Sequence, residues 1–534
     1  MHTECYPISI LPRLSRLFLD YAESRQPLTP FYPASPYAQL WTPPEQDPTL
    51  RSRIADLLEE QNRAFSASPA TLANIHRLRQ GSPAIVTGQQ VTLFGGPLFT
   101  LFKAATAIRK AQDTGAVPIF WLATEDHDLD EADHVVLPSR HELQTLRLTH
   151  DANSRPVGNL PLGPQIRPLL DQAAELLGPG PILDALEAAY TPEATFAQAF
   201  ARLLTTIFAD QGLILIDAAG PAFHALGAPV LRYAIEHAAE LESALLDRSK
   251  LLESRGYHAQ VLVAPSSSLL FLIDEDSGAR LALKRKNQPH KNEYWTAGKQ
   301  SYSTEDLLAI LDSAPERLSP NALLRPVFQD FLLPTVAYIG GPAEISYFAQ
   351  SQVLYEAILG RTTPVIPRLS AALVEPAVAT LLAQHEVSLD DILRSDGRSN
   401  PDELAQRLGA RAIPIEGKRK LASAGNALDE ELTSLTQWMH QLDPGLGRSA
   451  DVSASKMRYQ MNRLRRLAAN YQLQTEASLR RHVEVLYLNL LPDQHPQERI
   501  IGAAAFLARY GDSLVPQLID QASQECPGHK AIFL

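Results

Sequence analysis

The fold is decided by residues 84–136, which read AIVTGQQVTLFGGPLFTLFKAATAIRKAQDTGAVPIFWLATEDHDLDEADHVV. Two apolar runs, at 84–86 and 117–123, have the character of buried strands, and a helical pattern joins them. A glycine-containing loop follows the first run, and an acidic loop follows the second. This order predicts one strand–helix–strand unit of a parallel sheet. Both polar loops then lie at the carboxyl ends of the strands, where open parallel sheets bind ligands.

The composition narrows the classes of partner. The chain has 534 residues, a formal net charge of −12 and two cysteines, Cys5 and Cys526. The negative charge argues against nucleic acid as the main partner, and the basic run 284–286 is interpreted as solvent-exposed surface. No apolar run reaches the roughly 20 residues of a membrane-spanning helix, and residues 1–5 do not resemble a signal peptide. A disulfide framework is implausible with two isolated cysteines, so we expect a reducing, cytoplasmic setting and no membrane.

Two further apolar runs extend the predicted sheet. The runs at 213–217 and 336–339 read as parallel strands, and glycines and a helix follow each of them. The longer segments between the strands predict inserted subdomains at about 138–210 and 255–300, the second built around a hairpin. Strands that alternate with helices predict an α/β fold with a parallel-sheet core.

The pattern changes to long helices towards the end of the chain. Apolar residues recur at alternating spacings of four and three over 421–442, and a second apolar stripe covers 457–471. The intervening Asp443-Pro444-Gly445 turn predicts an antiparallel coiled-coil hairpin. The spacing leaves open whether this hairpin braces the core or forms a dimer.

These patterns divide the chain into three parts. Residues 1–374 are assigned to the parallel-sheet core with its insertions, and residues 375–499 to the helical coiled-coil domain. Residues 500–534 are predicted to be helices that pack back on the core. The first 45 residues are expected to form an irregular arm, in which residues 11–21 could form a short helix.

The loop after the first strand is a candidate phosphate-binding loop. It contains Thr87-Gly88-Gln89-Gln90 and a second glycine pair ending in Gly96, and the following helix carries Lys103. Backbone N–H groups of such a loop can approach a phosphate at a helix N-terminus. The loop matches neither the dinucleotide motif nor the P-loop motif, so a tight turn without a ligand explains it equally well.

The loop after the second strand concentrates charge. It reads Glu125-Asp126-His127-Asp128, and eight ionisable residues lie within 125–134. Carboxylates and an imidazole in this position can exchange protons with a substrate or ligate a divalent metal. An acid-rich helix start would explain Asp128 through the helix dipole, but it would not explain His127. We therefore treat the four residues as catalytic candidates and leave any metal unspecified.

A third polar group surrounds the fourth predicted strand. Asn321 and Arg325 precede the strand four residues apart, whereas Gly341, Glu344 and Tyr347 follow it directly. In a parallel sheet these residues would reach the edge that carries the two loops. Helix capping combined with surface polarity is the alternative explanation for them.

Three signatures resemble those of the cysteine ligases of bacillithiol biosynthesis. The first comprises TGQQ at 87–90, GPL at 96–98, KA at 103–104, PIFW at 118–121 and EDHD at 125–128. The second comprises SPN at 319–321, RP at 325–326, LPT at 333–335 and GPAEISY at 341–347, and the third is PRLS at 367–370. The resemblance covers the whole chain. It implies a Rossmann-like core with connecting insertions, laid out as in class I nucleotidyl-transferring synthetases, and a coiled-coil domain that supports a homodimer.

The resemblance also implies a reaction, in which L-cysteine is joined through an amide bond to the amine of glucosaminyl malate. Amide formation needs an activated carboxylate, and an ATP-derived acyl-adenylate or acyl-phosphate is the natural route. ATP, or its ADP or AMP product, is therefore the expected cofactor, with a magnesium ion as a further candidate. The chain lacks the HxGH signature of class I synthetases, so adenylate chemistry does not follow from the fold analogy.

On this hypothesis the candidate residues have three roles. The nucleotide or acyl phosphate would be held by Thr87, Gly88, Gln89, Gln90, Gly96 and Lys103. The amine would be positioned and deprotonated by Glu125, Asp126, His127 and Asp128. The substrates would be bound by Trp121, Asn321, Arg325, Gly341, Glu344 and Tyr347, since a guanidinium forks onto a carboxylate. Two alternatives are a nucleotide-binding scaffold that acts through its coiled coil and a metal-dependent hydrolase.

Overall fold

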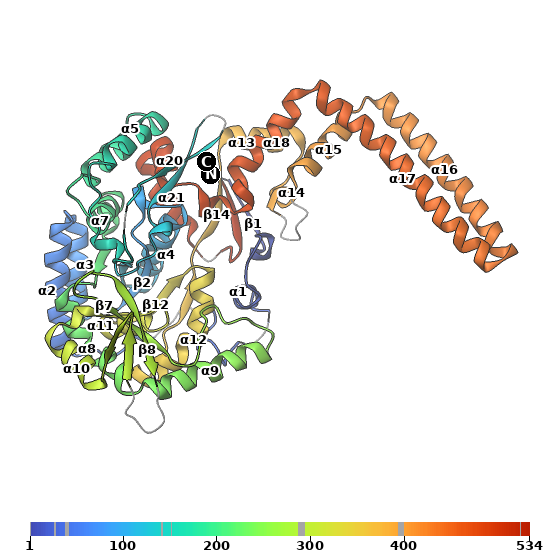
Figure 1. Cartoon of the computed structure of the whole chain (residues 1–534). Coiled ribbons are helices and arrows are strands. Elements are labelled where there is room, and N and C mark those ends of the chain that lie inside the picture. Colours follow the sequence, from blue (N-terminus) through green and yellow to red (C-terminus); the bar gives the residue numbers. More distant parts are fainter. Residues whose placement is uncertain are drawn as a thin grey trace.

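The computed structural model describes residues 2–25, 28–37, 42–139, 142–150, 152–286, 294–393, 400–523 and 525–534. Its centre is a parallel sheet with the strand order β13-β12-β2-β3-β6 (Figure 1). The strands are β2 (Ala84–Gln89), β3 (Val117–Leu122), β6 (Ile214–Asp217), β12 (Thr335–Gly340) and β13 (Val365–Pro367). The four predicted strands all lie in this sheet, which confirms the α/β fold with a parallel-sheet core.

Both faces of the central sheet are buried, which explains why its strands are continuous apolar runs. Val86 and Ile119 belong to one apolar cluster, whereas Phe120 belongs to a second and Ile85 to a third. Helix α4 packs on β2, β3 and β12. The helices of this part are α2 (Pro48–Ala64), α3 (Pro69–Arg79), α4 (Phe99–Thr114), α8 (Pro221–Glu236), α9 (Ala238–Ser254), α10 (Thr304–Ser313), α11 (Arg325–Leu332) and α12 (Pro342–Leu359).

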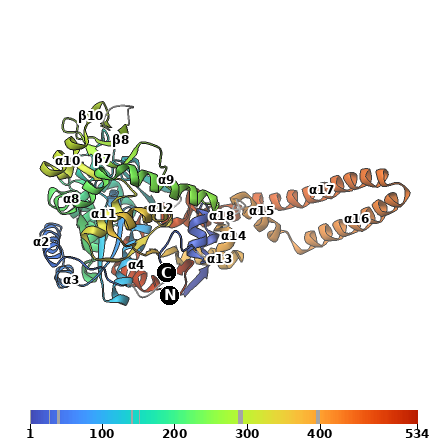
Figure 2. The same ribbon diagram turned by 90° about the horizontal axis from the view of Figure 1, so that it is seen from below.

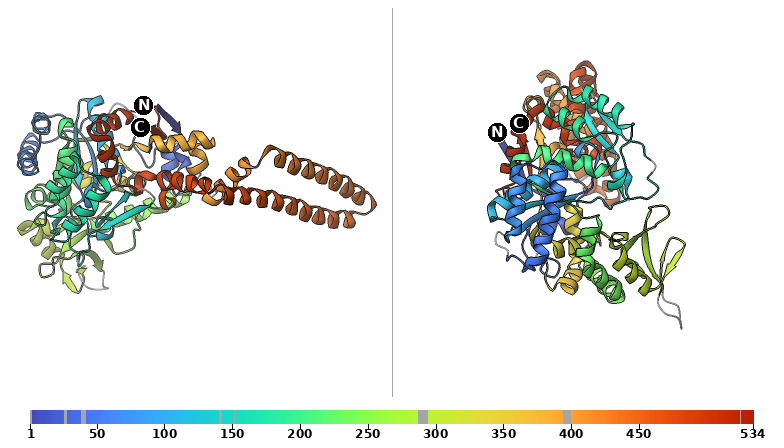
Figure 3. Two further views of the ribbon diagram at one scale, coloured as in Figure 1. Left: turned by 90° about the horizontal axis from the view of Figure 1, so that it is seen from above. Right: turned by 90° about the vertical axis from the view of Figure 1, so that its left-hand side faces the viewer.

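Two additional units interrupt the core. One contains the hairpin of β4 (His134–Pro138) and β5 (Leu143–Arg147), followed by α5 (Ile166–Leu177), α6 (Pro181–Ala189) and α7 (Phe196–Ile207). The other is an antiparallel sheet of order β10-β9-β8-β7-β11, which stands beside the core in the right-hand view of Figure 3. Its strands are β7 (Ser267–Ile273), β8 (Arg280–Lys286), β9 (Tyr294–Ala297), β10 (Gln300–Tyr302) and β11 (Leu318–Pro320).

The second unit reaches the central sheet through its last strand. Strand β11 ends one residue before Asn321, and α11 begins at Arg325. The predicted hairpin is confirmed as β7 and β8. Residues 287–293 of the second predicted insertion lie outside the described residues.

The two ends of the chain meet in a third sheet. Strand β1 (His2–Tyr6) pairs antiparallel with β15 (His529–Phe533), which pairs parallel with β14 (Ser370–Val374). Strand β1 shows that the N-terminal arm is not wholly irregular, whereas helix α1 (Arg16–Ala22) agrees with the short helix expected in it. Residues 500–534 are not wholly helical, because they include β15. Strand β1 pairs with a strand at the opposite end of the chain, and about 150 residues separate β14 from β15, so local periodicity did not reveal either pairing.

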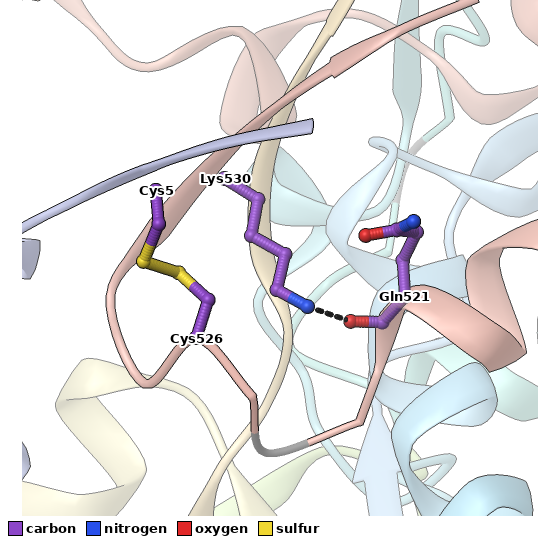
Figure 4. The surroundings of a disulfide bond; sticks show 4 residues. All are labelled: Cys5, Gln521, Cys526 and Lys530. Atoms are coloured by element: carbon purple, nitrogen blue, oxygen red, sulfur yellow. Dashed lines mark hydrogen bonds between the residues drawn. A yellow bond between two sulfur atoms is a disulfide. The ribbon is translucent and has the colours of Figure 1, made fainter. Parts of the chain in front are cut away.

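A disulfide joins Cys5 to Cys526 beside this sheet, where Lys530 also donates a hydrogen bond to the Gln521 carbonyl (Figure 4). The expectation that the cysteines build no disulfide is therefore wrong. It failed because the two residues, separated by 521 positions, become neighbours only when β1 pairs with β15. The expectation of a reducing setting rested on the absence of a disulfide, so it has no support from the cysteines.

A helical arm projects from the core, and Figures 1, 2 and 3 all show it extending away from the sheet. Helices α16 (Ile415–Leu442) and α17 (Pro444–Thr475) form the predicted antiparallel hairpin, which turns at Asp443. Leu432 and Met461 are buried in it, whereas Leu464 is 55% exposed. The base of the arm is made by α13 (Pro376–His385), α14 (Leu389–Leu393), α15 (Pro401–Ala412) and α18 (Ala477–Leu490).

The last helices return to the core. Helix α21 (Leu514–Gln521) packs on α4, and α20 (Ala503–Tyr510) packs on α6. The short α19 (Gln497–Ile500) contacts β14. Across the ranges that the structure describes, none of the helices is both long and apolar enough to cross a membrane.

Candidate functional site

A cleft of about 840 Å³ lies at the carboxyl edge of β2, β3 and β12. The three groups of polar residues expected at this edge meet in it, although they come from distant parts of the sequence. Phe271 and Arg280 of the second inserted unit complete its wall. The predicted residues on the wall are Gly88, Gln89, Gln90, Lys103, Trp121, Glu125, Asp126, His127, Asn321, Arg325, Gly341, Glu344 and Tyr347.

A buried ion pair connects the glycine loop to α12. The Lys103 ammonium lies 2.5 Å from Glu344 and donates to the Gly88 carbonyl at 2.6 Å and to Gln89 at 2.9 Å. These three acceptors engage all three protons of the ammonium group. Burial lowers the pKa of Lys103 even though Glu344 opposes that effect. Lys103 therefore fixes the loop after β2 against the start of α12.

Glu344 is held by donors from three directions. Burial alone would raise its pKa, but the Lys103 ammonium and the hydrogen bonds from Tyr338 and Gly341 together lower the pKa of Glu344. The Tyr338 hydroxyl donates to this carboxylate at 2.6 Å, and the Gly341 N–H donates at 2.7 Å. The Gly341 bond caps the N-terminus of α12. Glu344 is thus a fully engaged anion at the base of the cleft.

Arg325 supplies a guanidinium beside this pair. It donates to Gln329 at 3.0 Å and to the Tyr347 hydroxyl at 3.1 Å, and it lies over the Tyr338 ring at 5.7 Å. The Asn321 side-chain oxygen accepts from the N–H groups of residues 323 and 324, so it caps the turn that leads into α11. The predicted capping role of Asn321 and its place on the cleft wall are both observed.

The acidic loop after β3 is anchored by a buried histidine. His224 on α8 lies 2.8 Å from Glu125, and its side chain is fully buried. Burial opposes protonation of His224, but Glu125, with smaller contributions from the Pro315 backbone and Glu316, raises the pKa of His224. Close by, burial raises the pKa of Asp217, which accepts a hydrogen bond from the Thr124 hydroxyl at 2.5 Å. Glu125 is therefore partnered inside the protein.

Asp126 organises the backbone of the same loop. Its carboxylate accepts from Gln90 at 2.7 Å, from the His127 N–H at 2.7 Å and from the Asp128 N–H at 3.2 Å. The bond to Gln90 joins the acidic loop to the glycine loop. Two loops that the sequence placed at neighbouring strand ends are therefore in direct contact.

His127 lies against the second inserted unit. Its ring centroid is 5.7 Å from that of Phe271, and its Nδ1 atom is 3.4 Å from the Arg280 guanidinium. The side chain is 36% exposed, so a ligand in the cleft can reach it.

Several arginines also line the cleft. Arg368 pairs with Glu498 at 2.7 Å, and both side chains are buried. Burial and the neighbouring Arg368 lower the pKa of Arg499. Together with Arg280 and Arg325, these side chains fit an anionic ligand such as a nucleotide phosphate or a carboxylate.

Among the described residues, no three His, Cys, Asp or Glu side chains come together in a metal-binding group.

Three predicted residues lie away from the wall of the cleft. Thr87 is buried in β2 and donates to the Ile339 carbonyl at 2.9 Å. Gly96 has a φ of +69°, and a Cβ there would lie 2.1 Å from the Thr92 hydroxyl, so the turn itself requires glycine. Asp128 precedes the short helical turn at 129–131. Thr87 and Gly96 therefore serve the architecture of the loop.

Four residues of the site were missed by sequence reasoning. Arg280, Arg368 and Arg499 line the cleft, and His224 supports Glu125. Arg368 falls within the PRLS signature, which was the signal that could have identified it. The basic run was also misread in part, because Arg285 is buried and paired with Glu242.

Comparisons with known proteins agree over the whole chain. Residues 1–369 match the family model "Bacillithiol biosynthesis BshC, N-terminal Rossmann-like domain", and residues 371–534 match the C-terminal coiled-coil domain of the same family. Proteins named "Putative cysteine ligase BshC" are similar to this chain. The one from Koribacter versatilis is 43% identical and that from Solibacter usitatus 35%, each over 100% of both chains. A third, from Symbiobacterium thermophilum, is 33% identical over 91% of this chain and 90% of its own. The chain therefore belongs to the BshC family of bacillithiol biosynthesis, with a Rossmann-like core and a coiled-coil domain.

Proposed function

We propose that this chain is an ATP-dependent ligase that joins L-cysteine to the amine of glucosaminyl malate. One observation carries the proposal. A single cleft at the carboxyl edge of the sheet brings a group of cationic side chains together with the Glu125–Asp128 loop. The cations suit the phosphates and carboxylates of the reactants, and the loop suits proton transfer at an amine. The relatives named cysteine ligases support the same reaction.

The proposed substrate contacts divide between two walls. Arg325 and Asn321 hold a carboxylate of a substrate, since Arg325 lines the cleft from the start of α11 and Asn321 from the turn before it. Arg368 and Arg499 neutralise the phosphates of ATP, which supplies the energy for activating the cysteine carboxylate. Nucleotide binding by Gln89 and Gln90 would use the loop that Lys103 fixes.

The acidic loop handles the amine. An amine attacks only when it is unprotonated, so a carboxylate of this loop accepts its proton while the loop holds it near the activated carboxyl group. The pair of Glu125 and His224 keeps the loop in position. The network between Asp126 and Gln90 does the same from the opposite side.

We further propose that the hairpin arm forms a homodimer. Large apolar side chains are exposed along both of its helices. They include Leu435, Trp438, Leu442, Leu446, Val452, Met457, Tyr459, Leu464, Leu467 and Tyr471. We call these side chains the exposed apolar residues of the arm. A second copy of the arm would bury them in a coiled-coil contact.

The reaction can be tested with purified full-length protein. ATP, L-cysteine and glucosaminyl malate are supplied together, and the condensed thiol is measured by mass spectrometry while released ADP or AMP is measured by chromatography. We expect nucleotide release that requires both other substrates. Nucleotide binding without turnover would instead support the scaffold. Activity without ATP that stops on adding a chelator would support the hydrolase.

A genetic experiment gives an independent check. Deleting the gene should remove bacillithiol and cause glucosaminyl malate to accumulate, and the wild-type gene should reverse both changes. Unchanged bacillithiol in the deletion strain, with no accumulated glucosaminyl malate, would contradict the ligase assignment.

A further inference from the structure

The second inserted unit places one buried cation next to the acidic loop. Arg280 begins strand β8, and it is 8% exposed in a protein whose arginines lie mostly at the surface. Its pKa is lowered by burial, with Glu125 and Asp126 opposing that effect. A guanidinium buried in this way needs hydrogen-bond acceptors for its N–H groups.

Two of the three guanidinium nitrogens are fixed within the inserted unit. Nε donates to the Ser319 hydroxyl at 2.9 Å, and one terminal nitrogen donates to the Pro320 carbonyl at 2.9 Å. The guanidinium carbon also lies 3.9 Å from the centre of the Phe271 ring. These contacts set the plane of the group. The other terminal nitrogen is thereby directed at Nδ1 of His127, 3.4 Å away.

The contact determines which nitrogen of His127 carries the proton. A guanidinium has only N–H donors and no acceptor, so the atom facing it must offer a lone pair. Nδ1 is therefore unprotonated in the neutral ring, and the proton sits on Nε2. The nearest carboxylate oxygen, from Asp126, is 3.8 Å from Nδ1 and already accepts two backbone N–H groups. It does not compete for a proton at Nδ1.

We infer that Arg280 is a positioning residue that holds His127 as the Nε2–H tautomer. In this state His127 donates a hydrogen bond through Nε2 and does not take up a proton there. Under the proposed function, on which this part rests, its target is the carbonyl oxygen of the activated cysteine carboxyl group, where negative charge develops during attack by the amine. Proton acceptance then falls to a carboxylate of the same loop. His127 thus stabilises the carbonyl oxygen by donating a hydrogen bond, and a different residue accepts the proton of the amine.

The tautomer can be measured without any substrate. Protein with ¹⁵N-labelled histidine is studied by long-range ¹H–¹⁵N correlation spectroscopy at pH 8, above the ordinary imidazole pKa of about 6.5. The His127→Gln variant identifies the signals of His127. We expect a pattern in which Nε2 is protonated and Nδ1 is not. Protonated Nδ1 in the wild-type protein would overturn the inference, even if the ligase reaction is confirmed.

Substitutions of Arg280 test the cause. Arg280→Met keeps the apolar stem and removes every donor, so the His127 signals should shift to a mixture of tautomers. Arg280→Lys keeps a single cationic nitrogen with N–H donors and should therefore restore part of the wild-type tautomer pattern. Arg285→Met is the matched control, because Arg285 is equally buried on the same strand but pairs with Glu242 outside the cleft. An unchanged tautomer in folded Arg280→Met would show that Arg280 does not set it.

Kinetics then connect the tautomer to the reaction. We expect kcat of Arg280→Met to fall at least tenfold, with partial recovery in Arg280→Lys, because a wrongly placed ring proton impairs catalysis by histidine. Arg285→Met should keep its kcat within about twofold. If the wild-type protein has the expected tautomer but no ligase activity, the proposed function fails and the assignment of Arg280 stands. A shifted tautomer with unchanged kcat would contradict the role given to His127.

Discussion

The cleft and the α16–α17 hairpin depart from the usual distribution of side chains in opposite directions. In the cleft, Lys103 and Glu344 carry charges although their side chains are only 4% and 16% exposed. In the hairpin, Trp438 and Leu464 are apolar but 53% and 55% exposed. Burying a charge and exposing a large apolar side chain are both unfavourable. Each arrangement is tolerated only where other groups offset its cost.

The difference lies in how each region is completed. The buried charges of the cleft find their partners inside the same chain, as Lys103 does with Glu344 and Arg368 with Glu498. The exposed apolar residues of the hairpin need a surface from outside. The cleft should therefore respond to changes within the chain, whereas the hairpin should respond to protein concentration.

The largest expected effect is on the buried ion pair. Lys103→Met leaves Glu344 as an uncompensated buried charge and should lower the free energy of unfolding by about 3–5 kcal/mol. Urea denaturation followed by circular dichroism measures the change. Lys110→Met on the same helix is the control, because Asp113 is 4.0 Å away and 38% exposed, and it should cost less than about 1 kcal/mol.

A double variant tests the mechanism of that loss. Adding Glu344→Gln to Lys103→Met removes the stranded charge and should recover most of the stability. Equal losses in Lys103→Met and Lys110→Met would show that the pair of Lys103 and Glu344 is no more important than the longer pair of Lys110 and Asp113.

His127 should affect activity with little effect on stability. His127→Ala is expected to abolish turnover, which for a loss of at least 100-fold corresponds to about 2.7 kcal/mol or more of transition-state stabilisation. The melting temperature should remain within a few degrees because the side chain is partly exposed. His237→Ala, at an exposed position outside the cleft, should leave both quantities unchanged. Full activity in His127→Ala would move the chemistry to another part of the sheet edge.

Acid should weaken the core through His529. Burial lowers the pKa of this histidine to about 4, below the 6.5 of a free imidazole. The unfolded chain therefore binds a proton at a higher pH than the folded protein, so stability falls as the pH drops from 6.5 towards 4. Between pH 6.5 and 4.5 this loss should reach about 2–3 kcal/mol.

Thermal or urea unfolding across this pH window measures the loss. The window lies above the range in which Glu498, whose carboxyl pKa is lowered by Arg368 against the effect of burial, becomes protonated. His529→Gln should flatten the pH dependence. His440→Gln in the hairpin, where the side chain is 42% exposed, should retain it. The same acid sensitivity in His529→Gln as in wild type would contradict the assignment.

The smallest effect on the stability of the single chain is expected in the hairpin. Leu464→Glu should change the free energy of unfolding of the dilute protein by about 0.5 kcal/mol or less, because the side chain is already exposed. It should nevertheless shift the protein from dimer to monomer in sedimentation velocity. Gln460→Glu adds the same charge at an exposed polar position one turn away and should keep the dimer. A wild-type protein that is monomeric at all concentrations would contradict the proposal that the exposed apolar residues of the arm form a homodimer.

Local sequence patterns were sufficient for the central sheet and the hairpin. The run over 213–216 is apolar because the strand is covered on both faces, and the spacing over 421–442 reflects a helix packed along one stripe. Such signals lie within a few residues and need no knowledge of distant segments. Strand β1 has no comparable signal, since its residues alternate irregularly between exposed and partly buried positions.

Residues of the candidate site could be predicted only where a chemically suitable residue type lay next to a recognisable strand or loop pattern. Lys103 was expected near the loop, but its ion pair depends on Glu344, which is 241 positions away and belongs to a different signature. Gly96 was easy to single out but its role was not, because the sequence cannot distinguish a glycine that a turn requires from a glycine that lets the backbone approach a phosphate. Arg280 had no signal at all. One arginine in a strand becomes informative only when folding brings His127 next to it.

The bridge between Cys5 and Cys526 makes the polypeptide almost a closed ring, with the hairpin turn at Asp443 as its outermost point. A single proteolytic cut in that turn would not release a fragment, because the two halves would remain one covalent molecule until a reductant opened the ring. The same geometry allows a circular permutant whose new ends lie at the turn and whose old ends are joined by a short linker. Such a permutant would carry its termini at the tip of the arm and leave the cleft intact.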